Sequence, residues 1–305
     1  MMLGAASDVW RFQPHPEVWV LIIGLLAMGW YVARVLGPQV VADTDTVVTR
    51  NQTRWFFGAI ALLWIVSDWP IHDLSEEYLY WVHMVQHLVI TFVIPPMVLL
   101  ATPEWLARLI VSSDGSSGVW IRRLAHPIVA GLLFNAVVAV THAPVVVNFS
   151  VENGPFHYAL HVTVFMTALL MWVPVAGPLP ELRISLPAQM IYLFLMSVIP
   201  TIPGGWLTFA DSAVYSAYDH DVRLWGTTVI RDQQAAGMIM KVVGGFYLWS
   251  IIAVLFFRWS NTSSDEHRKM RRVDSAEILT YDEVSSAFAE SGPAPVEPSP
   301  ETDAP

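Results

Sequence analysis

The 305-residue sequence contains no cysteine. This absence excludes disulfides, thiolate nucleophiles, iron–sulfur ligation and every metal motif built on cysteine. Any site for a soft metal ion must therefore use histidine and methionine, with carboxylates in support. The absence says little about the compartment, because oxidising and reducing compartments both tolerate a chain without cysteine.

Charge is also scarce, since Asp, Glu, Lys and Arg make up 14% of the residues, against about 25% in an ordinary soluble domain. Hydrophobic residues make up 54%, including 14 Trp and 14 Phe. This composition excludes a disordered chain and a coiled coil, and it argues against a single soluble globule. The formal net charge of −10 argues further against nucleic acid as a partner.

Long apolar runs are what the sequence has in place of charge. Each is near the ~20 residues that a helix needs to cross the hydrocarbon core of a bilayer. Pro and Gly mark most of their ends. We therefore predict an all-α, polytopic membrane protein in contact with lipid, with seven transmembrane helices near 17–36, 54–70, 78–101, 126–147, 156–175, 187–207 and 236–258.

The distribution of basic residues predicts the orientation of this bundle. With seven spans, 12 Lys and Arg residues fall on the side of the first, third and fifth loops and the C-terminus, and 3 fall on the other side. Because basic residues are retained in the cytoplasm, we expect the N-terminus outside and the C-terminus inside. Residues 1–259 are predicted to form the transmembrane domain. Residues 260–305 are predicted to form a disordered, acidic, Pro-rich cytoplasmic tail.

The predicted outer side is acidic. Either this face concentrates cations, or acids accumulate there because they have little influence on topology; both interpretations stay open at this point. It carries eleven carboxylates, namely Asp8, Glu17, Asp68, Asp73, Glu76, Glu77, Glu152, Asp211, Asp219, Asp221 and Asp232.

Two pairs of histidines are the main candidates for chemistry. His83 and His87 lie four residues apart in the third segment, and His157 and His161 lie four apart in the fifth. This spacing puts both rings of a pair on one helical face, with Cβ atoms about 6 Å apart. Both segments enter the membrane from the predicted outer side, so the pairs lie at a similar depth. Four imidazoles buried together predict a metal or haem site.

Weaker candidates lie at the same depth. They are His72, His142, Asp68 and Met84. His72 and His142 are also explained as interfacial residues bound to water, and Met84 as ordinary packing. The long outer loop before the last segment, with Tyr215, Tyr218, Asp219, His220 and Asp221, could cover the histidines. Asp232, Gln233 and Gln234 precede that segment and could cap it.

The ligand types leave the identity of the bound group open. Imidazole with nearby thioether suits copper, and neutral imidazole also suits zinc and iron. Two haems would clash at a spacing of four residues, but one haem-binding redox site remains possible. An intramembrane zinc hydrolase would need a carboxylate beside the metal, for which Asp68 is the candidate within a helix.

Several motifs resemble the CtaG-type family of cytochrome c oxidase assembly factors, a polytopic family of bacterial plasma membranes. The resemblance runs from about residue 17 to residue 258 and is specific as an ordered set. An unrelated group of copper chaperones sharing that name uses Cys ligands and is excluded here. The motifs are His83-Met-Val-Gln-His87 with Pro95-Pro96, His157-x-x-x-His161, Trp172-Val-Pro-Val-Ala-Gly-Pro178, Gln189-Met-Ile-Tyr-Leu-Phe194, Asp232-Gln-Gln-x-x-Gly-x-Ile-Met240 and Gly244-Gly245.

This resemblance implies a non-enzymatic helper in oxidase maturation that takes part in copper supply to the haem–copper centre. It implies oxidase subunits as partners and an extracytoplasmic copper donor. The natural copper ligands are then His83, His87, His157 and His161. A purely structural bundle that scaffolds oxidase subunits is the alternative in which the histidines bind no metal.

Overall fold

The computed structural model describes residues 10–42, 44–111, 116–219, 223–277, 281–290 and 292. Within these ranges the chain is helical and contains no strand. It divides into two compact units, residues 1–256 and 257–305. The all-α fold predicted from the sequence is therefore confirmed for the described residues.

Five helices are long and apolar enough to cross a membrane, and two bent helix pairs bring the number to seven if each pair is one span. The prediction of seven spans thus lies at the upper end of this range, and the orientation stays a prediction. The five are Pro16–Val40 (α2, Pro16–Tyr31; η1, Val32–Leu36; α3, Gly37–Val40), Tyr80–Ala101 (α6, Tyr80–Leu88; η3, Val89–Val93; α7, Ile94–Ala101), Gly154–Ala176 (α12), Leu186–Thr208 (α13, Leu186–Val198; α14, Thr201–Thr208) and Val229–Ser264 (α15, Val229–Met238; η7, Ile239–Val243; the start of α16, Gly244–Glu277).

The two bent pairs coincide with the second and fourth predicted segments. Helix α4 (Arg50–Ser67) continues after a 53° bend into Ile71–Tyr78, and the end of α9 (Ser116–Leu124) joins α10 (Pro127–Thr141) at 74°. Pro70 lies in the first break and Pro127 follows the second, and proline cannot continue the preceding helix. The remaining described helices are α5 (Ile71–Asp73), η2 (Leu74–Tyr78), α8 (Glu104–Ile110), α11 (Pro144–Glu152), η4 (Pro180–Leu182), η5 (Ser216–Tyr218), η6 (Leu224–Gly226) and α17 (Tyr281–Glu290).

Local capping explains where several helices begin. Thr49 and Gln52 form a capping box at the start of α4, in which the side chain of each accepts from the backbone N–H of the other. The Asn153 side chain accepts a hydrogen bond from Phe156 N–H at the start of α12. The same helix ends before Gly177, its C-cap residue. These signals place α12 so that its histidine pair falls within the first eight residues of the helix.

The prolines Pro95 and Pro96 change the helix that carries the other histidine pair. They follow the π-helical turn η3 rather than ending the helix. Proline has no N–H, so the carbonyls of Thr91 and Phe92, four residues earlier, lose their usual helical donors. The indole of Trp172 donates to the first carbonyl at 3.0 Å, and the hydroxyl of Tyr247 donates to the second at 2.9 Å.

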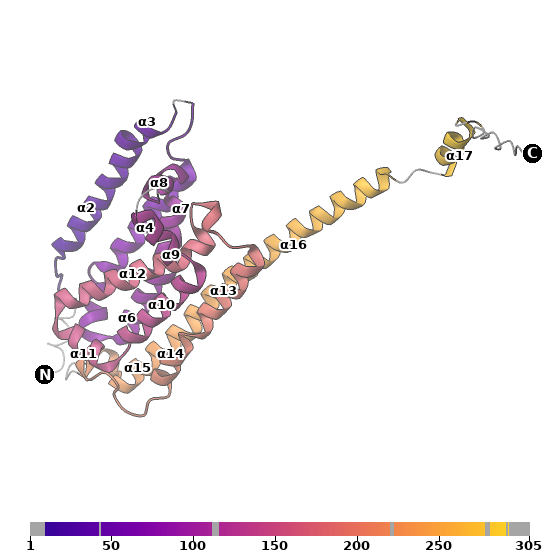
Figure 1. Cartoon of the computed structure of the whole chain (residues 1–305). Coiled ribbons are helices and arrows are strands. Elements are labelled where there is room, and N and C mark those ends of the chain that lie inside the picture. The colour runs from indigo at the N-terminus through magenta and orange to yellow at the C-terminus, as the bar shows by residue number, and fades with distance from the viewer. Residues whose placement is uncertain are drawn as a thin grey trace, which may run out of the picture. The chain divides into compact units, whose positions relative to one another are not determined.

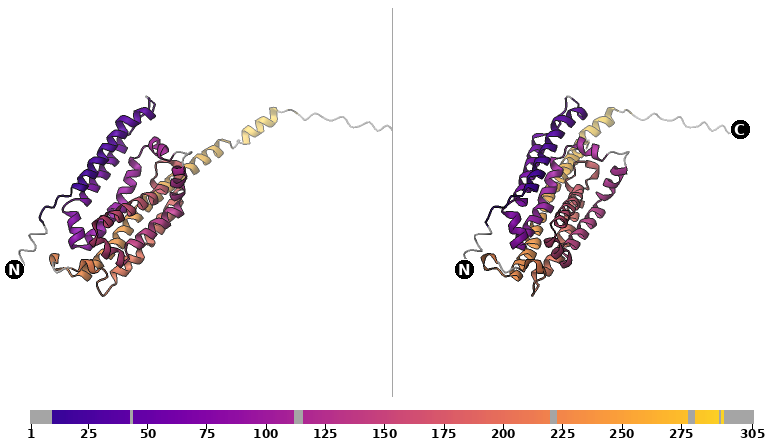
Figure 2. Two further views of the ribbon diagram at one scale, coloured as in Figure 1. Left: turned by 60° about the vertical axis from the view of Figure 1, so that its left-hand side comes forward. Right: turned by 90° about the vertical axis from the view of Figure 1, so that its left-hand side faces the viewer.

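Within the first unit the helices run side by side as a bundle, with α2 at one edge beside α4 (Figures 1 and 2). Helix α7 packs against α4 and α12, α12 against α10, and α15 against α6 and α14. The main apolar core lies between these helices and includes Tyr80, Phe134, Trp172, Leu193 and Leu248. Helices α6 and α12 therefore carry their histidine pairs into the interior.

The second unit corresponds to the predicted tail. Helix α16 continues past residue 259 to Glu277, and α17 occupies Tyr281–Glu290, so these parts are helical. Residues 278–280, 291 and 293–305 lie outside the described residues. Disorder there stays a prediction.

Candidate metal centre

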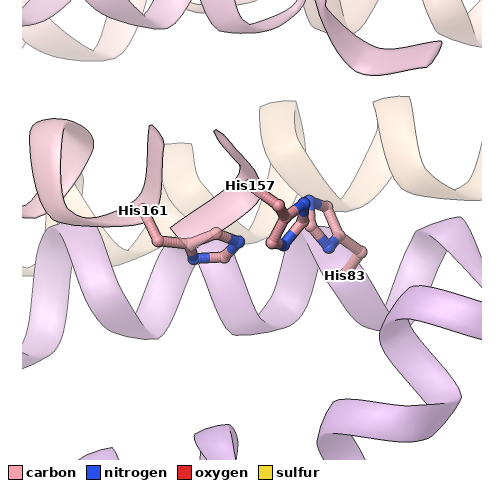
Figure 3. Close-up of side chains that lie close together, drawn as sticks. All are labelled: His83, His157 and His161. Atoms are coloured by element: carbon pink, nitrogen blue, oxygen red, sulfur yellow. The ribbon is translucent and has the colours of Figure 1, made fainter. Parts of the chain in front are cut away.

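Three histidines converge in the interior of the bundle. His83 from α6 and His157 and His161 from α12 each offer a ring nitrogen, and these three atoms lie within 4.8 Å of one another. Figure 3 shows the three side chains close together, although they come from segments more than 70 residues apart. The sequence predicted that the two histidine pairs lie at a similar depth, and the structure brings members of both pairs together.

His87 belongs to the same cluster. Its ring centroid lies 4.5 Å from that of His83 and 4.8 Å from that of His161. All four histidines of the two predicted pairs are therefore adjacent. His142 lies at the margin, with its ring 6.3 Å from that of His87 and its Nδ1 2.7 Å from the Val138 carbonyl.

Several ring nitrogens of this cluster are buried without a hydrogen-bond partner. They include His83 Nδ1, His142 Nε2 and His161 Nε2. Burying an unpaired polar atom costs free energy, so each such atom calls for an explanation, of which an unplaced ion is one. Neutral imidazole nitrogens with free lone pairs are suitable ligands for copper or zinc.

The cluster surrounds a small cavity of about 20 Å³. A volume of ~10–15 Å³ measured in this way holds one water molecule, so the cavity has room for a single ion. It is lined by Tyr80, His83, Met84, His87, Thr141, His142, Val147, Ser150, His157, Leu160, His161 and Tyr218. The weaker candidates His142 and Met84 are thus part of this wall.

His72 reaches the cluster through a carboxylate that was not among the predicted ligands. Glu76 Oε1 lies 2.9 Å from His157 Nε2 and 3.4 Å from His72 Nε2. The sequence places Glu76 four residues after His72, a spacing that joins two side chains on one helical turn. That spacing was the available signal for Glu76, whereas its contact with α12 depends on the tertiary fold.

Asp68 is placed elsewhere. Its carboxylate accepts hydrogen bonds from the indoles of Trp19 at 3.0 Å and Trp64 at 2.7 Å, and from the backbone N–H of Trp69 at 2.9 Å. These three donors direct Asp68 toward the tryptophans between α2 and α4. The structure therefore does not bring it together with the histidine pairs.

The loop between α14 and α15 contributes to the wall of the cavity. Tyr218 lines the cavity, and Tyr215 donates from its hydroxyl to the His142 carbonyl at 2.9 Å. Burial raises the pKa of the Tyr215 phenol to about 12, which keeps it protonated as a donor. Gln233 fixes the loop by accepting from Val214 N–H and donating to the Tyr215 carbonyl. His220 and Asp221 lie outside the described residues.

The expected cap at residues 232–234 is corrected by the structure. Helix α15 begins at Val229, because Thr228 accepts from Arg231 N–H as its N-cap. Asp232 consequently lies inside α15 and caps a different helix. Its two oxygens accept from the backbone N–H groups of Tyr80, at 2.9 Å, and Trp81, at 3.1 Å, at the start of α6.

Fold and site together define a helical membrane protein that encloses an imidazole cluster. The profile of the family described as cytochrome c oxidase caa3 assembly factor matches residues 29–262, and the chain belongs to this family. An uncharacterized protein of Mycobacterium leprae (strain TN) is 23% identical over 294 residues, which cover 90% of this chain and 42% of the relative. The chain thus spans about two fifths of that relative's length. No solved structure matches it.

Proposed function

We propose that this assembly factor binds a copper ion with its histidine cluster and passes the ion toward the haem–copper centre of cytochrome c oxidase. The observation that carries the proposal is the convergence of His83, His157 and His161 within 4.8 Å, beside a cavity of about 20 Å³. The role is one of binding and delivery, without catalysis.

The composition of the cavity wall favours copper. The chain has no cysteine, and the wall combines imidazoles with the thioether of Met84. Imidazole suits copper in general, while thioether ligands favour Cu(I). The cavity size argues against both alternatives. A haem, like other cofactors, needs a pocket of roughly 300 Å³ or more, and a zinc hydrolase needs space for a substrate beside the ion.

The setting follows from the family and from the predicted orientation. An assembly factor of this oxidase acts on oxidase subunits, which we propose as the acceptors of the ion in the bacterial plasma membrane. With the N-terminus outside, the cluster lies toward the outer side of the membrane. An extracytoplasmic protein is then the copper donor.

Metal analysis of the purified chain tests this proposal. The wild type, equilibrated with copper under reducing conditions and freed of excess, should retain about one copper ion per cluster, as expected for one small cavity. The variant H83A/H161A should lose it, because two of the three converging ligands are gone. H126A is the matched control, since His126 is exposed and lies outside the cavity wall. A folded wild type that retains no copper would overturn the proposal, and a Soret band would favour haem.

A further inference from the structure

A second group of metal-ligating side chains lies next to the histidine cluster and has no part in the site proposed above. Its centre is Glu76, whose Oε1 lies between the Nε2 atoms of His72 and His157. Glu76 is partly exposed, whereas His72 and His157 are 7% and 6% exposed. Glu76 therefore connects the surface with the interior.

The surroundings of Glu76 contain further ligand atoms without partners. His72 Nδ1 and Asp73 Oδ2 are buried and accept or donate no hydrogen bond. His15 adjoins this group, with its ring 4.7 Å from that of His72 and its Nε2 2.8 Å from Asp73 Oδ1. Imidazole nitrogens and carboxylate oxygens are thus held together away from the cavity.

We propose that His72 and Glu76 form an outer metal subsite, through which a copper ion reaches the inner cluster of His83, His157 and His161. This inference rests on the proposed function of the inner cluster. Glu76 is the shared element, because the same oxygen approaches an outer imidazole and an inner one. The ion keeps its oxidation state during this transfer.

The chemistry of the two ligand sets gives the transfer its direction. The outer subsite mixes imidazole with carboxylate, a hard ligand that suits Cu(I) poorly. The inner cluster offers several imidazoles and the thioether of Met84, which suit Cu(I) better. The partly exposed Glu76 carboxylate also raises the local concentration of cations and so the rate of capture. The ion is therefore captured outside and held more tightly inside.

A different role for Glu76 makes a different kinetic prediction. A carboxylate that only orients a ligating imidazole raises the affinity of the metal, typically 10–100-fold. Its removal would speed the release of copper and leave its capture unchanged. Removal of a transfer subsite slows capture and release together, because the ion uses the same route in both directions. The equilibrium affinity of the inner cluster then stays the same.

The variant E76Q separates these roles, because glutamine keeps the size of the side chain and removes its charge. Cu(I) bicinchoninate supplies the ion to the full-length chain in detergent, and the loss of its absorbance in a stopped-flow instrument reports capture. Release is followed by adding excess bicinchoninate to the loaded chain. E77Q is the control, because Glu77 is the exposed neighbour of Glu76.

We expect E76Q to slow capture and release by about tenfold, within the range of electrostatic effects on rates, with affinity and copper content unchanged. E77Q should match the wild type. Unchanged capture by E76Q, or faster release with weaker affinity, would overturn the subsite while leaving the inner site in place. A wild type that binds no copper would instead overturn the proposed function itself.

As a second measurement, H83A/H161A should bind copper weakly at copper concentrations above those that saturate the wild type. This weak binding should be lost when excess copper is removed, and it should be absent in H72A/H83A/E76Q/H161A at any of these concentrations. Equal residual binding in both variants would also overturn the subsite.

Discussion

The indole N–H of Trp172 donates to the backbone carbonyl of Thr91, 3.0 Å away, and this carbonyl has lost its helical donor because residue 95 is proline. The hydroxyl of Tyr247 likewise donates to the carbonyl of Phe92 at 2.9 Å, which lacks its helical donor because residue 96 is proline. An unpaired carbonyl is expensive inside a membrane, where no water replaces the missing donor. The two prolines are therefore tolerated because side chains of α12 and α16 supply the donors.

Replacing Tyr247 by phenylalanine should destabilise the protein by about 1 kcal/mol, the usual scale for one hydrogen bond in a membrane protein. The ring remains, so the loss reports the hydroxyl alone. Denaturant unfolding in detergent micelles, followed by far-UV circular dichroism, gives the free energy of unfolding. Y31F is the control, because Tyr31 is half exposed at the edge of the bundle. Equal stabilities of Y247F and the wild type would show that the hydrogen bond to Phe92 contributes nothing.

The helices and the two histidine pairs could be predicted from the sequence, because both depend on local spacing. Apolar length predicted the helices that are long enough to cross a membrane, and the four-residue spacing placed two imidazoles on one face of a helix. Residues that act across the fold could not be found in this way. Asp232 caps a helix that begins about 150 residues earlier, and no pattern near residue 232 names that partner.

Asp232→Asn should destabilise the protein by about 2 kcal/mol, since a charged acceptor is lost at the start of α6. The first N–H groups of a helix have no acceptor within it and carry partial positive charge. His83 lies one turn after these groups, so copper affinity should also fall. D211N is the matched control, because Asp211 is exposed. If the two variants unfold at the same denaturant concentration, the carboxylate is not the cap that stabilises α6.

Gly237→Ala should destabilise the packing of α14 against α15 by about 1–3 kcal/mol, the range for an overpacked contact. A Cβ at residue 237 would lie 2.6 Å from the Gly204 carbonyl oxygen and 2.8 Å from the Thr208 nitrogen. Both atoms belong to backbone, so neither can rotate away. G205A is the control, because a Cβ there has no atom within 4 Å. Unfolding in detergent compares the two, and similar losses for both would contradict close backbone packing as the cause.

The sequence alone could not show which carboxylate lies beside the histidines, because that contact depends on the tertiary fold. Asp68 and Glu76 are both carboxylates in the same stretch of chain. In the structure, the Asp68 carboxylate accepts hydrogen bonds from three tryptophan N–H groups. Glu76 instead lies beside two imidazoles. The difference arises from the 53° bend after α4, which turns residues 71–78 toward α12. A helix continued straight from α4 would not have this contact.

Copper should stabilise the folded protein, because a ligand that binds only the folded state adds RT ln(1 + [L]/Kd) to its stability. At a free copper concentration 100 times Kd, the gain is about 2.7 kcal/mol. Unfolding curves with and without copper should differ by this amount for the wild type and for H126A. H83A/H161A should show no gain, since two of its three converging ligands are missing. Removal of copper by a chelator should return the wild type to its original curve. An equal gain in the double variant would place the copper outside the histidine cluster.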